Sequence, residues 1–136
     1  MSTSYRLLRI ALVVFGVLML LVYPLAVVWP SGWIWHHGAP HESQYFMMIV
    51  GIYATLGVFL INAARNPAAN VSLIWFTVWS SVVHAAIMAV QSFGHGHMAH
   101  LWGDVPALVL IAAILGVLMK SSGVERESAR DGRVDR

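Results

Sequence analysis

Residues 71–93 decide the fold, and they read VSLIWFTVWSSVVHAAIMAVQSF, without one aspartate, glutamate, lysine or arginine. A helix needs about 20 mainly apolar residues to cross the hydrocarbon core of a bilayer. The segment is therefore predicted to be a transmembrane helix. His84 lies inside it, roughly 13 Å from its end at Phe93 by the helical rise per residue.

Three further segments have this length and character: residues 7–28, 45–64 and 100–119, the last with an alternative start at Val105. We therefore predict an all-α integral membrane bundle of four transmembrane helices within residues 1–120. The first segment exceeds the about 7–15 apolar residues of a signal peptide, so we expect it to be retained. Pro24 is expected to kink it. Residues 121–136 mix charges with Gly and Ser and are predicted to form a mobile charged cytoplasmic tail.

Composition supports a membrane protein. Hydrophobic residues make up 59% and charged residues 10%, and the mean hydropathy is +0.73. Charge this sparse cannot cover a water-facing surface, which excludes an ordinary soluble domain. The absence of cysteine excludes disulfides and thiolate metal sites. The net charge of +2 gives no reason to expect nucleic acid as a partner.

Basic residues indicate the orientation. All eight lie before or at the start of the first span, between the second and the third, or after the fourth: Arg6, Arg9, Arg65, Lys120, Arg126, Arg130, Arg133 and Arg136. Cytoplasmic loops of membrane proteins carry the excess of lysine and arginine. Both termini are therefore predicted to lie in the cytoplasm.

Polar residues near the non-cytoplasmic side of the membrane suggest a ligand pocket. His84 follows Thr77, Ser80 and Ser81 and precedes Gln91 at helical spacing, which gives an apolar helix one polar stripe. Ionisable groups at this depth usually face the bundle interior or a wet cavity. The candidate pocket residues are His84, Gln91, Glu42, Ser81 and Tyr53. The alternatives are a histidine that only joins helices, Glu42 as a helix cap or as a charge that stabilises the helix dipole, and Tyr53 as a packed aromatic.

The outer loops suggest a second kind of site. His36, His37, His41, His97, His100 and Asp104 could ligate a zinc, copper or iron ion, because imidazole and carboxylate groups bind these metals. Their spacing matches no established metal motif. The alternative interpretation is that the histidines are polar loop residues and that Asp104 caps the fourth helix.

Small residues recur at helical spacing. Examples are Ala112 with Gly116, Ser81 with Ala85 and Ala89, and Gly51 with Ala54 and Gly57. Such spacing lets membrane helices approach closely. It is compatible with a compact bundle in the lipid bilayer, with a homo-oligomer and with a membrane-protein partner.

Part of the chain resembles a known group. The relevant residues are Glu42 before the second span, Met48-Ile49-Val50-Gly51-Ile52-Tyr53 within it, the turn Ala64-Arg65-Asn66-Pro67, and Ser80-Ser81-Val82-Val83-His84. They resemble small uncharacterised bacterial four-helix membrane proteins of the DoxX-like group. The resemblance implies a four-helix fold and a bacterial inner membrane, and it implies no particular activity.

The sequence is compatible with three classes of function. The chain has no nucleophile elbow, zinc-protease motif or phosphate-binding loop, so an enzyme is not favoured. The leading prediction is a small non-enzymatic multi-pass membrane protein that binds a partner or a small apolar ligand through an outward-opening polar pocket. The alternatives are a histidine-based metal-binding or redox protein and an accessory subunit of a larger membrane complex.

Overall fold

The computed structural model describes residues 2–28, 39–95 and 103–134. These ranges form helices joined by short turns, and they contain no strand, which confirms the all-α prediction. In chain order the elements are α1 (Thr3–Leu20), α2 (Val22–Val28), the 3-10 turn η2 (Pro40–Glu42), α3 (Gln44–Ala63), the 3-10 turn η3 (Pro67–Asn70), α4 (Val71–His95), α6 (Asp104–Ser122) and α7 (Val124–Val134).

Four helical segments of the described ranges are long and apolar enough to cross a membrane, with mean hydropathies between 1.7 and 2.0. They are Thr3–Leu20, Gln44–Ala63, Pro67–Ser92 and Val105–Ser122. The first predicted span is divided, because α1 ends at Leu20 and α2 begins at Val22. Pro24 explains the break, since it has no N–H to donate to the carbonyl of Leu20.

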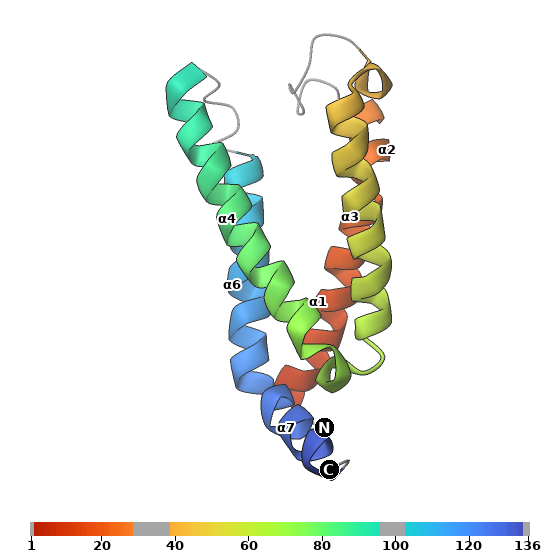
Figure 1. Ribbon diagram of the computed structural model, residues 1–136, viewed down its shortest axis with the longest axis vertical. Helices are drawn as coiled ribbons and strands as arrows, with labels where there is room; N and C mark the ends of the chain where they lie inside the picture. The colour runs from red at the N-terminus through yellow and green to blue at the C-terminus, as the bar shows by residue number, and fades with distance from the viewer. Residues whose placement is uncertain (1, 29–38, 96–102, 135–136) are drawn as a thin grey trace.

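The helices form two pairs that meet at one end (Figure 1). α1 packs along α3, and α4 packs along α6. α1 also contacts α6 near the end that holds both termini, and the two pairs diverge toward the opposite end. The molecule therefore has the shape of a V whose arms are the α1–α3 and α4–α6 pairs.

The main hydrophobic core lies where the two pairs meet. Leu8, Leu12 and Phe15 recur every three to four residues on α1, so they share one face of the helix. That face packs with Leu60 of α3 and Leu115 of α6, all in one cluster. A separate small cluster of Val22, Ala26 and Phe46 holds α2 to α3. The two pairs are thus held together mainly near the termini.

Two glycines set the spacing of α1 and α3. A Cβ built at Gly57 would lie 2.6 Å from the carbonyl oxygen of Gly16, and a Cβ built at Gly16 would lie 2.8 Å from the carbonyl oxygen of Gly57. The two backbones therefore touch, as small residues allow in membrane helices. The sequence indicated a small-residue stripe that includes Gly57, but it did not indicate Gly16 as its partner.

The charged tail, predicted to be mobile, contains helix α7. Gly123 ends α6 in the left-handed conformation with a φ of 76°, which glycine adopts without steric cost. This turn directs Val124 into the main core, where it is fully buried. The indole Nε1 of Trp75 donates a hydrogen bond to the Glu125 carboxylate over 2.7 Å. Both contacts hold the start of α7 against the bundle.

Candidate functional site

A tyrosine and a histidine meet between the two arms. The Tyr53 hydroxyl oxygen and Nδ1 of His84 are 2.8 Å apart and share a hydrogen bond. Their rings are stacked, with centroids 6.0 Å apart and planes inclined by 25°. Tyr53 comes from α3 and His84 from α4. Each side chain is half-buried, so this polar contact bridges the arms and remains partly accessible.

Both residues lie near the middle of their helices. Tyr53 follows the start of α3 at Gln44, and His84 follows the start of α4 at Val71. By the rise per residue, Tyr53 is roughly 14 Å from the start of its helix along the axis, and His84 is roughly 20 Å from the start of its own. In a bilayer this contact lies within the hydrocarbon core, where hydrogen-bonding groups are best satisfied by protein partners. Tyr53 is therefore more than a packed aromatic residue, because its hydroxyl group shares a hydrogen bond with His84.

Hydroxyl groups of the polar stripe on α4 form hydrogen bonds with the backbone of the same helix. The Thr77 hydroxyl donates to the carbonyl of Leu73 over 2.9 Å, and the Ser80 hydroxyl donates to the carbonyl of Thr77 over 3.2 Å. Such bonds to the preceding turn are common for hydroxyl groups inside helices. Ser81 is buried in the same helix. The hydroxyl groups of Thr77 and Ser80 thus donate to carbonyl groups of their own helix.

Glu42 and Gln91 lie away from the Tyr53–His84 contact. Both are exposed, Glu42 in η2 and Gln91 on α4. Gln91 is two turns beyond His84, or about 10 Å along the axis. The cap of α3 is Ser43, whose hydroxyl accepts a hydrogen bond from the Phe46 backbone N–H over 3.2 Å. Glu42 is not the N-cap residue, because the following serine occupies that position, and stabilisation of the helix dipole by its carboxylate stays a prediction.

The proposed metal ligands fall mostly outside the described residues. This applies to His36, His37, His97 and His100. His41 lies exposed in η2, and Asp104 begins α6, whose N-cap position is held by Gly103. The suggestion that Asp104 is the cap is therefore wrong by one residue, because Gly103 directly before it holds that position. Within residues 2–28, 39–95 and 103–134, no three histidine or acidic residues are grouped as a metal site.

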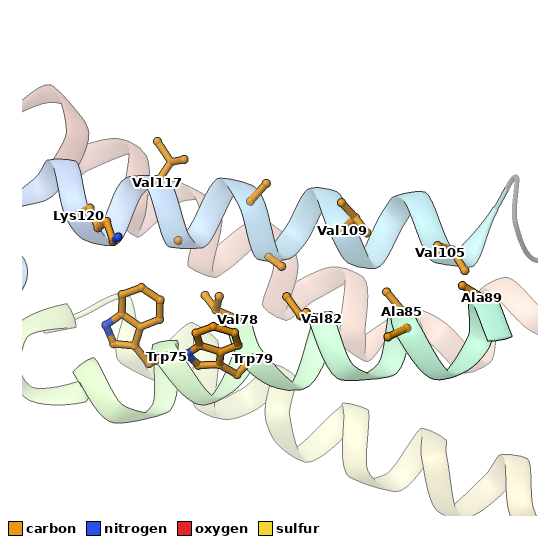
Figure 2. A pocket seen from close by; sticks show the side chains of 14 residues that line it. Trp75, Val78, Trp79, Val82, Ala85, Ala89, Val105, Val109, Val117 and Lys120 are labelled. Carbon is orange, nitrogen blue, oxygen red and sulfur yellow. The ribbon is translucent and has the colours of Figure 1, made fainter.

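The small residues of α4 and α6 line a groove of about 750 Å³ between these helices (Figure 2). Ala85, Ala89 and Gly116 belong to its lining. Trp75 and Trp79 lie along the half of the groove that ends at Lys120 (Figure 2). The sequence predicted these small residues as a helix-packing feature, and the structure shows that they also line an apolar groove between α4 and α6.

Comparison with known proteins gives one match. A family model described as "Family of unknown function (DUF6632)" matches residues 2–136. The match provides no link to the DoxX-like group suggested by the sequence pattern. No curated protein and no solved structure matches the chain. The chain, an all-α protein with four apolar helices of membrane-spanning length, therefore belongs to the DUF6632 family.

Proposed function

We propose that this chain is a non-enzymatic integral membrane protein that binds a small apolar ligand carrying one hydrogen-bonding group. The proposed site centres on the Tyr53–His84 contact, and Gln91 and Glu42 lie on the side of this contact toward which α3 and α4 diverge. The observation that carries the proposal is the 2.8 Å hydrogen bond between two half-buried rings at membrane depth. Ionisable residues inside a membrane are costly and usually functional.

The arrangement of the two arms gives the proposed site a direction along the bundle. α3 and α4 converge near η3, which joins them, and separate toward their other ends (Figure 1). The Tyr53–His84 contact joins them part-way along. Gln91 and the start of α3 after Glu42 both lie on the diverging side of this contact. A ligand on that side would contact apolar side chains of the helices. It could also form a hydrogen bond with the Tyr53 hydroxyl or the His84 imidazole.

The same proposal includes an orientation. Arg6, Arg9, Arg65 and Lys120 all lie toward the end of the bundle that carries the termini and the η3 turn. We propose that this end is cytoplasmic, following the distribution of basic residues in membrane proteins. The site then opens away from the cytoplasm, in a bacterial inner membrane.

Two variants and a matched control test the proposed site. His84→Leu removes the imidazole, and Tyr53→Phe removes only the hydroxyl. Tyr45→Phe makes the same chemical change at an exposed tyrosine on the same helix. Each full-length protein is purified in mild detergent, extracted with organic solvent, and the extract is examined by mass spectrometry. The thermal unfolding midpoint is measured on the same samples.

We expect one small molecule to accompany wild type and Tyr45→Phe and to be depleted in His84→Leu. Tyr53→Phe should retain an intermediate amount, because the imidazole remains. The lost interhelical hydrogen bond should also cost roughly 0.6 kcal/mol, and at most about 1.7 kcal/mol, of stability. Extracts of His84→Leu identical to those of wild type would contradict ligand binding, and a lower midpoint alone would identify His84 as a structural residue.

A further inference from the structure

Three arginines surround a cavity on the α1–α3 arm. The cavity has a volume of about 680 Å³ and is lined by Arg6, Arg9, Ile10, Val13, Val14, Ile61, Ala64 and Arg65. Its lining has three cationic side chains and no acidic one. The sequence explains these arginines as orientation signals, but that role does not require them to share a cavity with aliphatic side chains.

Along the lining of this cavity, charged side chains come first and apolar side chains follow. Arg6 and Arg9 are one turn apart on α1, and Ile10 and Val13 continue the same face toward the membrane interior. Arg65 enters from the turn after α3. The cavity therefore has a cationic end near the end of the bundle and an apolar remainder along the helices.

Arg9 is held in place by the end of α3. Its Nε donates a hydrogen bond of 2.7 Å to the backbone carbonyl of Ala64. A guanidinium has five N–H donors, so this bond leaves both terminal nitrogens able to donate elsewhere. Arg6, Arg9 and Arg65 are all exposed, so their guanidinium groups can be reached by a ligand.

We propose that this cavity binds an anionic phospholipid. The phosphate lies between Arg6, Arg9 and Arg65, and an acyl chain lies along Ile10, Val13 and Ile61. Guanidinium groups bind phosphate oxygens through paired, charge-assisted hydrogen bonds. The aliphatic wall selects a lipid over a free phosphate, because only a lipid covers the exposed apolar surface beside the charges.

Native mass spectrometry of the full chain in neutral detergent tests this site. The added probes are dioleoylphosphatidylglycerol, dioleoylphosphatidylcholine with the same acyl chains, and glycerol 3-phosphate without them. The variants are Arg6→Gln with Arg65→Gln, which spare the structural bond of Arg9, and Val13→Trp, which fills the apolar part. Arg130→Gln removes one charge from α7, outside the cavity, and is the control for a loss of surface charge.

We expect wild type and Arg130→Gln to retain phosphatidylglycerol over phosphatidylcholine, with no displacement by glycerol 3-phosphate. The double arginine variant should bind phosphatidylglycerol at least about tenfold more weakly, since hydrogen bonds to charged groups are being removed. Val13→Trp should also weaken binding, which separates a lipid site from surface attraction. Equal retention of both lipids, displacement by glycerol 3-phosphate, or an equal loss in Arg130→Gln would overturn the proposal.

Discussion

The contact of Gly16 with Gly57 allows a quantitative test of the fold. Gly57→Ala places a methyl carbon 2.6 Å from the Gly16 carbonyl oxygen, 3.2 Å from Cγ of Leu20 and 3.2 Å from Cβ of Met19. Atoms in ordinary contact are about 3.5–4.0 Å apart. The first contact is with backbone and cannot be relieved by a rotamer change. α1 and α3 must therefore separate by about 0.5–1 Å, which forfeits a quarter to a half of the dispersion energy of nearby contacts.

Overpacking of this kind costs roughly 1–3 kcal/mol. Alanine also favours a helix over glycine by at most about 1 kcal/mol, and this gain applies to every glycine-to-alanine change inside a helix. Gly51→Ala isolates that gain, because a Cβ at Gly51 meets nothing within 4 Å. We therefore expect Gly57→Ala to be less stable than Gly51→Ala by about 1–3 kcal/mol.

Gly116→Ala is the second control. Its Cβ would lie 3.8 Å from Cγ1 of Val78, which is ordinary contact, so we expect it to behave like Gly51→Ala. The assay is unfolding of the detergent-solubilised chain followed by tryptophan fluorescence, with six tryptophans as the probe. If Gly57→Ala is as stable as both controls, α1 and α3 do not cross at Gly16 and Gly57, and the packing described above is refuted.

Two further predictions concern a helix start and the orientation. Ser43→Ala removes the hydroxyl that caps α3 and should lower the unfolding free energy by about 1 kcal/mol, whereas Glu42→Ala should change it little, because Ser43 is the cap. Chemical denaturation of the two variants in one detergent decides between these residues. A pH-sensitive fluorescent protein fused after Arg136 should report a cytoplasmic position in intact cells. Fluorescence that responds to a change in external pH would reverse the proposed orientation.

The transmembrane segments were predictable from the sequence. Each requires only about 20 apolar residues in a row, which is a property of one stretch of chain. The prediction for residues 45–64 differs from α3 by one residue at each end. The end of α1 near Pro24 was also predictable, because the missing N–H acts locally. Helix α7 was not, since its charged sequence gains order from Val124 in the core and from the Trp75–Glu125 hydrogen bond.

The candidate sites depended on the tertiary structure to different degrees. His84 was identifiable from sequence because a polar group inside an apolar span is conspicuous, but its hydrogen bond to Tyr53 was not. The approach of Gly16 to Gly57 and the gathering of Arg6, Arg9 and Arg65 also required the structure. Hydropathy fixes which segments enter the membrane, because transfer from water depends on each segment alone. Which faces then meet depends on the crossing of helices far apart in the chain, and that is decided by side-chain packing between them.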